Sequence, residues 1–352
     1  QTSSSSSGGG RGPREFHFIC ESFFLTARAL HLGVVKLVNE RLHRARYSLP
    51  SLQQDHDQLE AELPRVAGTA RELEVKMMLA RYKAALDKEK AAMMGTEAVL
   101  NDPDFMGEIL AFYRLLCAWM LCVAAPSLQR NLSALSLPLP SPPPPEFTQL
   151  PEHFVEDVAD LLLYVSRAYP HLLQGARMDE VMLFLVVFMG SPEYVKSSHL
   201  RSKLAEVLHV WLPQDDDVAA GGRPMSARMR APPGRSQLSG ELSSLFRGHP
   251  MVVQHLVPTL LRLYVDVEFT DQSNQFYAKF SLRHAIGEVL FYLWNEPQHR
   301  EVWRAFAQAS GRGSGDYVRF CNMLISDSIY LLDECLKKLQ EIKENETAMA
   351  DF

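Results

Sequence analysis

The middle of the chain has the most regular pattern of apolar and polar residues. Between residues 198 and 212, apolar side chains recur at spacings of three and four, at Leu200, Leu204, Val207, Leu208 and Trp211. These spacings place them on one face of an α-helix. Ser197 or Ser198 is positioned to cap that helix, and Ser191-Pro192 has the form of an earlier cap followed by proline at the first helical position. The pattern predicts an amphipathic helix after a capped turn, with four polar residues off the apolar face: Arg201, Lys203, Glu206 and His209.

The same periodicity covers most of the first half of the chain. One helix is predicted from near Glu15 through Leu42, and Pro50 to Met94 is predicted to form a short and a long helix, broken near Pro64 or Gly68. Asp102-Pro103 opens a helix that ends at Pro126. The interior of that helix is apolar nearly all round, which predicts deep burial of Phe112, Leu115, Leu116, Trp119 and Met120.

The second half continues as helices near 149–169, 178–190, 198–212, 238–247, 249–269, 275–295, 297–309 and 316–346. Alternating apolar and polar residues are almost absent, and the short run Tyr264–Phe269 continues the helical pattern before it. Helix pairs with short connections predict an all-α protein, an elongated helical-repeat solenoid of the armadillo or HEAT type. No strict period is visible, so the repeats are expected to be divergent.

Three segments interrupt this pattern. Residues 1–14 are rich in serine and glycine and are predicted to be a disordered linker. Residues 131–148 contain a proline-rich run, and residues 214–236 combine acids, glycines, prolines and arginines. Both are interpreted as disordered, low-complexity insertions. The proline-rich run could be a ligand for an SH3 or WW module, but a spacer is the preferred interpretation.

Composition narrows the class of protein. The apolar fraction of 47% and charged fraction of 22% are those of a soluble globular protein, and the net charge of −6 favours neither nucleic acid nor an anionic membrane as a partner. Five cysteines form no regular framework and lie within apolar helical patterns, so we expect reduced thiols in an intracellular protein. No membrane span is predicted, since Glu108 and Arg114 break the longest apolar stretch.

Candidate residues for catalysis or metal binding are scattered along the chain. His249 and His255 are six residues apart and cannot share a helix face as the histidines of His-x-x-x-His do, and the five-residue spacing of Cys117 and Cys122 is awkward for joint ligation of zinc. The run Gly311–Gly315 follows a helix and lacks the lysine of a phosphate-binding loop, so it is predicted to be a loop before an N-cap. We therefore expect no catalytic, cofactor-binding or metal-binding residue here.

Two further groups are predicted to be structural. Asp333-Glu334 lies on an exposed helix face, next to lysines at helical spacing. The second group is aromatic: Phe276, Tyr277, Phe280, Phe291, Tyr292 and Trp294. The apolar residues between Leu282 and Leu293 follow so regular a helical pattern that core packing is expected to explain most of these aromatics.

Five segments resemble one known family, the ubiquitin conjugation factors E4. Two of them are Phe-Phe-Leu-Thr-Ala-Arg-Ala-Leu-His-Leu-Gly33 and Glu180–Gly190, which leads into the third, Ser191-Pro-Glu-Tyr-Val followed by His-Leu-Arg-Ser-Lys-Leu-Ala-Glu-Val-Leu208. The fourth is Gln275–Leu290, similar to the family's Phe-Tyr-x-Lys-Phe helix. The fifth is Phe320–Glu334, similar to its Asn-Met-Leu-x-x-Asp and Tyr-Leu-Leu-Asp-Glu signature. They occur in the family's order, and together they span most of residues 16–346.

The resemblance implies an armadillo-like core followed by a C-terminal U-box. In that family the U-box recruits a ubiquitin-conjugating enzyme, chains are lengthened on substrates that already carry ubiquitin, and the product is degraded by the proteasome. It also implies ubiquitinated proteins and an AAA ATPase of the valosin-containing type as partners, a role in degradation from the endoplasmic reticulum, and a cytoplasmic and nuclear location.

On this basis residues 15–346 are interpreted as the elongating-factor core, and residues 347–352 as its end before a U-box that this sequence lacks. We expect the chain to be a scaffold without ligase activity of its own, because no catalytic-facing residue of a U-box has a counterpart in it. The alternative is a non-catalytic helical-repeat adaptor that binds other proteins.

Overall fold

The computed structural model of the chain describes residues 17–100, 102–126, 135–212, 235–267, 278–310 and 315–350. Helices account for most of these residues, and no strand occurs among them. The predicted linker 1–14, and nearly all of the predicted insertion 214–236, lie outside the described residues. The chain divides into two units, residues 1–102 and residues 103–352, and each is described by itself.

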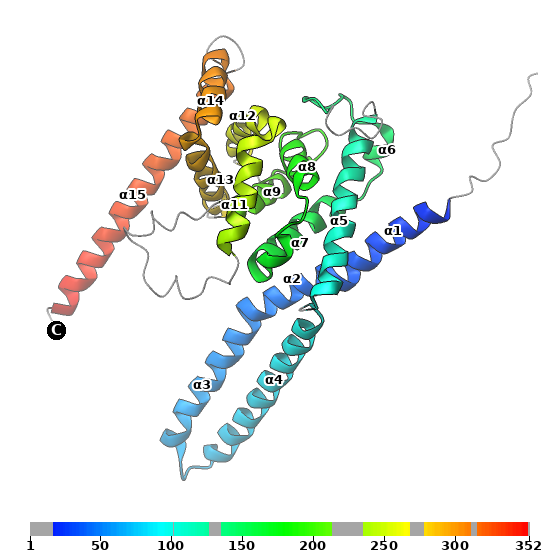
Figure 1. Cartoon of the computed structure of the whole chain (residues 1–352). Coiled ribbons are helices and arrows are strands. Elements are labelled where there is room, and N and C mark those ends of the chain that lie inside the picture. Colours follow the sequence, from blue (N-terminus) through cyan, green and yellow to red (C-terminus); the bar gives the residue numbers. More distant parts are fainter. Residues whose placement is uncertain are drawn as a thin grey trace, which may run out of the picture. The chain divides into compact units, whose positions relative to one another are not determined.

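The first unit is a nearly continuous helical segment that turns back on itself (Figure 1). Two π-helical turns connect its first three helices, and α3 and α4 pack as a hairpin. The elements are α1 (Phe18–Leu30), η1 (His31–Val35), α2 (Lys36–His43), η2 (Arg44–Ser48), α3 (Leu49–Val66) and α4 (Arg71–Leu100).

The hairpin turn lies at Gly68, one of the two positions at which the sequence predicted a break. Gly68 has a φ of +80°, a conformation that residues with a Cβ rarely adopt. Its amide donates to the carboxylate of Glu72 at 2.6 Å, and the Thr69 hydroxyl donates to the carbonyl of Val66. Pro64, the other candidate, lies within α3.

The described residues of the second unit are also all-helical. Its elements are α5 (Pro103–Ala124), α6 (Pro145–Thr148), α7 (His153–Ala168), η5 (Pro170–Leu173), α8 (Asp179–Met189), α9 (Ser198–Trp211), α11 (Arg235–Gly248), α12 (Pro250–Asp266), α13 (Ala278–Asn295), α14 (Pro297–Ser310) and α15 (Asp316–Ala350). These helices pack both on neighbours in the chain, such as α7 on α9, and on more distant helices, such as α9 on α13. This arrangement is that of a helical-repeat solenoid and confirms the predicted fold class.

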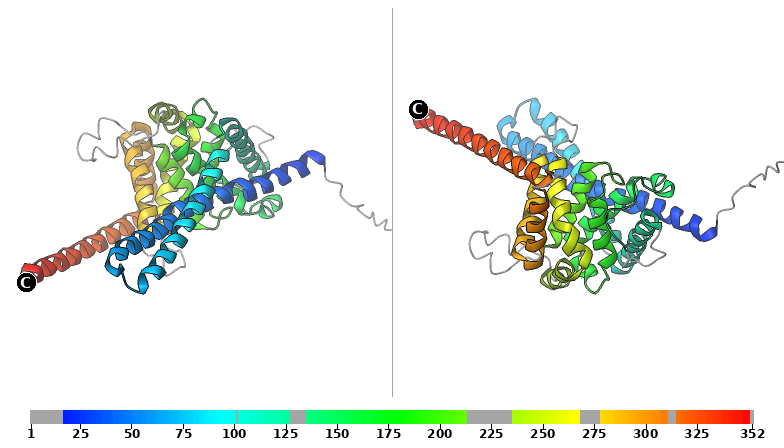
Figure 2. Two further views of the ribbon diagram at one scale, coloured as in Figure 1. Left: turned by 90° about the horizontal axis from the view of Figure 1, so that it is seen from below. Right: turned by 90° about the horizontal axis from the view of Figure 1, so that it is seen from above.

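Helices α8 and α12 form the centre of this unit. Every side chain from Val181 to Met189 is buried, so α8 is covered on all sides, as expected of a helix that is apolar all round. Helix α12 packs against α8, α9, α11, α13, α14 and α15. Figure 2 shows α12, α13 and α14 side by side in this unit. The burial of α8 and the many neighbours of α12 make these two helices the core on which the others are assembled.

The central amphipathic helix is the predicted one, with one difference. Ser197 is its N-cap and accepts from the amide of Leu200 at 3.2 Å, and Trp211 is buried with its indole N–H donating to the Ser166 hydroxyl at 2.7 Å. The prediction that Arg201 lies outside the packed face is wrong. Its side chain is buried and its guanidinium forms an ion pair of 2.8 Å with Asp266 of α12. A long side chain can cross a packed surface to reach a partner, which the apolar pattern does not reveal.

Helix α5 is only partly the buried helix that its composition predicts. Leu116 and Met120 are buried as expected, but the Leu115 side chain is 56% exposed. Among the residues that the structure describes, two stretches could cross a membrane by length and composition alone, Phe18–Arg41 and Pro103–Ala124. The second of these is α5, which packs against α8, and Arg114 of α5 lies 3.8 Å from the carboxylate of Glu180. Core helices pass the same test of length and composition.

Helix α15 has two parts. Its first turns pack on α12 and α14 through buried Phe320 and Asp327. Its later turns extend from the unit (Figures 1 and 2) and leave apolar side chains exposed, among them Leu332, Leu336 and Leu339. Asp333-Glu334 lies in this exposed part, as predicted, but the lysines pair one position closer than the predicted i,i+4 pairs Glu334–Lys338 and Lys337–Glu341: Glu334 pairs with Lys337 at 2.9 Å and Glu341 with Lys338 at 2.7 Å.

Candidate binding surface

The loop between α8 and α9 carries the most distinctive part of the sequence, Ser191 to Lys196. The Ser191 hydroxyl donates to the carbonyl of Val187 at 2.7 Å, and the Ser191 carbonyl accepts from the amides of Tyr194 and Val195. These bonds fold the segment into a turn, so the predicted proline-led helix start at Ser191-Pro192 is not formed. The hydroxyl of Ser191 donates to a carbonyl of the preceding helix, α8, instead of capping a following helix.

Tyr194 fastens this loop to two other parts of the second unit. Its hydroxyl is 2.7 Å from the carbonyl oxygen of Pro140 and 3.3 Å from that of Ala124, and its ring meets the Phe147 ring edge-on at 4.9 Å between centroids. Burial, and then the nearby carboxylate of Glu193, raises the pKa of Tyr194 above its ordinary value, so the hydroxyl stays protonated and able to donate. Tyr194 therefore links the loop after α8 to the end of α5 and to the proline-rich segment.

The proline-rich segment is packed over the part that the structure describes, residues 135–148. Leu135, Leu139 and Phe147 are buried, and Phe147 stacks on Phe188 of α8 at 5.4 Å. The interpretation of this segment as a disordered insertion is wrong for these residues. The prolines dominate the composition, but apolar side chains between them fill space over α8, and composition alone does not show this.

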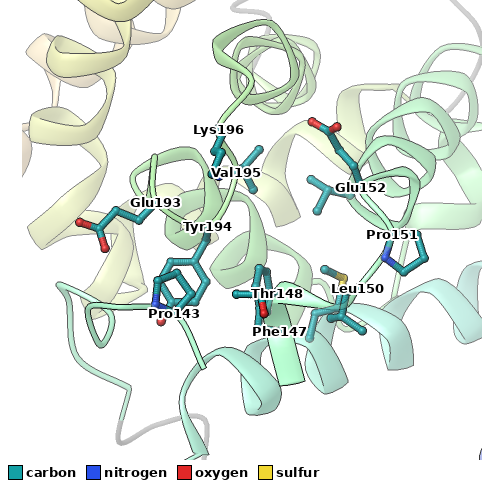
Figure 3. Close-up of a pocket in the computed structure, with 12 residues that line it drawn as sticks. Pro143, Phe147, Thr148, Leu150, Pro151, Glu152, Glu193, Tyr194, Val195 and Lys196 are labelled. Carbon is teal, nitrogen blue, oxygen red and sulfur yellow. The ribbon is translucent and has the colours of Figure 1, made fainter. Parts of the chain in front are cut away.

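Two cavities lie beside the loop. The first has a volume of about 240 Å³ and is lined mainly by apolar residues, among them Phe147, Leu150 and Val195 (Figure 3). The second has a volume of about 450 Å³, and its walls are the proline-rich segment on one side and His255, Pro258, Thr259 and Arg262 of α12 on another. Glu193 and Tyr194 line both cavities. The loop is thus the ridge between two hollows in one continuous surface.

Three charged side chains border the first cavity. Figure 3 shows Glu193 beside Tyr194 and Pro143, Glu152 on the other side beside Pro151, and Lys196 next to Val195. All three are exposed, and none has an ion-pair partner among the residues that the structure describes. In the second cavity Arg262 is already engaged, since its Nε lies 3.0 Å from the Asp316 carboxylate and its guanidinium stacks over Phe306. The surface combines apolar hollows with unpaired charge, a composition suited to binding another protein.

Away from this surface, a buried group of polar side chains joins the three helices α12, α13 and α15. Arg283 of α13 lies 2.7 Å from both carboxylate oxygens of Asp327 on α15, and its Nε donates to the carbonyl of Tyr264 on α12. The Tyr264 hydroxyl donates to Asp327 at 2.9 Å, and burial raises the pKa of Tyr264. Every member faces another protein group, so this group holds helices together and presents no reacting atom to solvent.

The candidate catalytic and metal-binding residues of the sequence are not brought together. His255 lines the larger cavity, whereas His249 occupies the N-cap position of α12, and burial lowers the pKa of both. Cys117 is fully buried, which raises its pKa. Residues 311–314 lie outside the described residues, and Gly315 with φ +67° directly precedes α15.

Among the described residues of the first unit, one group has the spacing of metal ligands. His56, Asp57 and Glu60 lie on α3 with ligand atoms within 4.8 Å of one another. Asp57 and Glu60 are exposed, as surface acids commonly are, and hydrogen bonds from Gln53 and His56 lower the pKa of Asp57. We assign no metal to it.

Sequence reasoning missed the two cavities. It identified Ser191–Val195 only as a stretch similar to a family, because its neighbours in space, Pro143 and Arg262, are about 50 and 70 positions away in the chain. The signals that could have pointed to the surface were the tyrosine and glutamate beside a proline and the leucines within the proline-rich run.

Comparison with known proteins assigns the family. The family model described as "Ubiquitin elongating factor core" matches residues 1–352. The chain is 38% identical over 354 residues to a probable ubiquitin conjugation factor E4 of Arabidopsis thaliana, covering 99% of this chain and 31% of the relative. Identity is 27% to ubiquitin conjugation factor E4 of Schizosaccharomyces pombe, over 95% of this chain and 31% of the relative. It is 25% to ubiquitin conjugation factor E4 A of Bos taurus, over 94% of this chain and 29% of the relative.

The chain thus spans about a third of the length of these relatives. The family model extends over every residue, including the proline-rich segment and the loop that carries the two cavities. The chain belongs to the ubiquitin elongating factor core family, that of the ubiquitin conjugation factors E4.

Proposed function

We propose that this chain is the scaffold part of a factor that elongates ubiquitin chains on substrates already carrying ubiquitin, which are then degraded by the proteasome. The observation that carries the proposal is the match of the elongating-factor core to all 352 residues. The ligase activity is assigned to a U-box outside these residues, which would recruit the ubiquitin-conjugating enzyme. The contribution of residues 1–352 is to hold the substrate.

The physical basis of such a role is positioning. A scaffold that holds two reactants near each other raises their effective concentration and needs no covalent chemistry of its own. Polar links between helices, buried or partly buried, support this role, because they resist relative movement of the helices. Examples in the second unit are Arg283 with Asp327 between α13 and α15, and Arg201 with Asp266 between α9 and α12.

The test is an elongation assay with ubiquitin-activating enzyme, ubiquitin-conjugating enzyme and a substrate fused to one ubiquitin. Three proteins are compared: the chain alone, a U-box alone, and the chain followed by the U-box. We expect long chains only with the joined protein. Elongation by the chain alone would show that it has its own ligase activity, and equal rates for the U-box and the joined protein would show that it is not a scaffold for this reaction.

Substrate binding is measured separately, by comparing retention of the ubiquitin-fused substrate and of the unmodified substrate on the immobilised chain. The proposal requires preferential retention of the fused form. Binding of proteins without any effect on elongation would favour the alternative, a helical-repeat adaptor. The proposed AAA ATPase partner is tested by the same retention assay with the purified hexamer, and the proposed cytoplasmic and nuclear location by imaging of a tagged chain.

A further inference from the structure

The two cavities beside the α8–α9 loop are parts of one surface. Both are lined by Glu193 and Tyr194, so a ligand that occupies one cavity and continues over this ridge enters the other. The ridge is preorganised, since the Tyr194 hydroxyl is held by the carbonyl of Pro140 and its ring by Phe147. A surface that keeps its shape before binding loses less entropy when it binds.

The size and lining of the first cavity fit a side chain rather than a whole small molecule. Its volume of about 240 Å³ is below the roughly 300–1,000 Å³ of small-molecule sites. Phe147, Leu150 and Val195 give it apolar walls. The second cavity, at about 450 Å³, is within that range and has a mixed lining: Leu137, Leu139 and Pro258 are apolar, and His255, Thr259 and Arg262 are polar. Each hollow can therefore take an apolar side chain from a segment that lies across the surface.

The charge between the two cavities indicates which kind of ligand residue would lie between the two apolar side chains. Glu193 lies between the cavities, is exposed, and has no ion-pair partner among the residues that the structure describes. Glu152 adds a second such acid, Lys196 adds one base, and Arg262 is compensated by Asp316 at 3.0 Å. The two free acids exceed the one free base, and Glu193 is the charged residue that lines both cavities.

We propose that this surface binds an extended peptide segment with a lysine or arginine between two apolar side chains. The apolar side chains occupy the two cavities, and the cation pairs with Glu193 on the ridge. The extended conformation follows from a ridge with a hollow on each side, because a chain must pass over the ridge to fill both. The proposal is independent of chain elongation, and binding is measured without conjugating enzyme.

The probes are fluorescein-labelled peptides with two leucines, one lysine midway between them, and serines elsewhere, in which one, three or five residues separate the leucines. Binding to the full chain is followed by fluorescence anisotropy. We expect one spacing to bind, and a glutamate in place of the lysine to weaken binding by more than Glu193→Gln does. Affinity is expected to fall as salt is raised, since exposed charges are screened. Glu193→Gln is expected to weaken binding about two- to fivefold, as for an exposed ion pair, and Glu193→Lys more.

Two matched pairs of variants locate the site. Thr148→Trp fills the first cavity and is expected to weaken binding at least about tenfold, whereas Gln149→Trp adds the same side chain next to the cavity without lining it. Glu146→Gln is the control for Glu193→Gln, because Glu146 is exposed on α6 and does not line either cavity. Melting temperatures confirm that each variant is folded.

Three results would overturn the proposal. The first is no binding by any lysine peptide, and the second is equal or stronger binding by the glutamate peptides, which would indicate an acidic partner. The third is unchanged affinity in both folded Thr148→Trp and folded Glu193→Lys.

Discussion

Substitution of Gly190 by alanine tests a close approach between α8 and α12 in the second unit. Gly190 follows the last residue of α8, and a Cβ at this position would lie 2.7 Å from the Thr259 hydroxyl oxygen and 3.2 Å from its methyl carbon on α12. Its φ of −87° is accessible to alanine, so backbone strain does not explain the glycine. The glycine is explained by the lack of space for a Cβ next to Thr259.

The magnitude follows from two opposing effects. Overpacking of a tight core costs about 1–3 kcal/mol. The neighbours are confined on the side of α8, where Val181 to Met189 are buried, whereas Thr259 also borders the second cavity. Replacing glycine restricts the unfolded chain and returns about 0.4–1 kcal/mol. The expected net loss in the free energy of unfolding is roughly 0.5–2 kcal/mol.

The control and the rescue come from the same chain. Gly107 lies inside α5, and a Cβ added there would meet no atom within 4 Å, so Gly107→Ala should stabilise the protein by about 0.5–1 kcal/mol. Thr259→Ala removes the two Thr259 atoms that the new Cβ at position 190 would meet and leaves its third neighbour, the Val186 carbonyl oxygen at 3.3 Å. Gly190→Ala should therefore cost less in the Thr259→Ala background, with a coupling energy of about 1–3 kcal/mol.

The assay is urea unfolding followed by tryptophan fluorescence. All four tryptophans, Trp119, Trp211, Trp294 and Trp303, belong to the second unit, so the signal reports on the unit that contains Gly190. If Gly190→Ala is as stable as the unsubstituted chain and shows no coupling to Thr259→Ala, the close approach of α8 and α12 is refuted.

Three further predictions concern other parts of the second unit. Leu290→Asp should unfold it, because a buried unpaired charge costs several kcal/mol, whereas Leu336→Asp on the exposed part of α15 should change the melting temperature little; similar melting of the two variants would contradict the assigned burial. Asp327→Asn should cost about 3–5 kcal/mol by leaving Arg283 without its charged partner, and Asp327→Asn with Arg283→Met should recover part of that loss; an equal or greater loss in the double variant would argue against the pair. Burial lowers the pKa of His299, whose Nε2 is 2.7 Å from the Phe246 carbonyl oxygen while Nδ1 has no partner among the described residues. Below about pH 6.5 the unfolded chain binds a proton that the folded chain does not, so the stability present above that pH is lost as the pH falls through the folded pKa. His299→Gln should show a shallower loss between pH 7 and pH 5, and an unchanged slope would exclude this histidine as a cause.

The secondary structure could largely be predicted because it depends on the sequence of residues that are close together in the chain. The stripe from Leu200 to Trp211 specifies which face of α9 is buried, and Ser197 caps the helix as a serine at that position should. Gly68 terminates α3 and begins the turn to α4 because few other residues adopt its φ. These features depend on a residue and its neighbours within one or two helical turns.

The contacts of polar residues could not be predicted in the same way. Arg201 and Arg283 look like surface residues in the sequence, yet each reaches a carboxylate on another helix, at Asp266 and Asp327, 65 and 44 positions away. The proline-rich segment looks like a spacer, yet Leu139 and Phe147 are buried and Phe147 stacks on α8. A pairing between distant positions leaves no periodic signal along the chain.

The sequence by itself determined the all-α class, the order and approximate bounds of the helices, and the family resemblance, because apolar period, caps and signature residues are all written locally. Only the tertiary structure decided that Glu193 and Tyr194 form a ridge between two cavities, that Gly190 is needed to let α8 approach α12, and that Arg283 and Asp327 join α13 to α15. Those features depend on distances between segments that are far apart in the chain. Packing sets these distances through shape and volume, and neither is visible in the order of the residues.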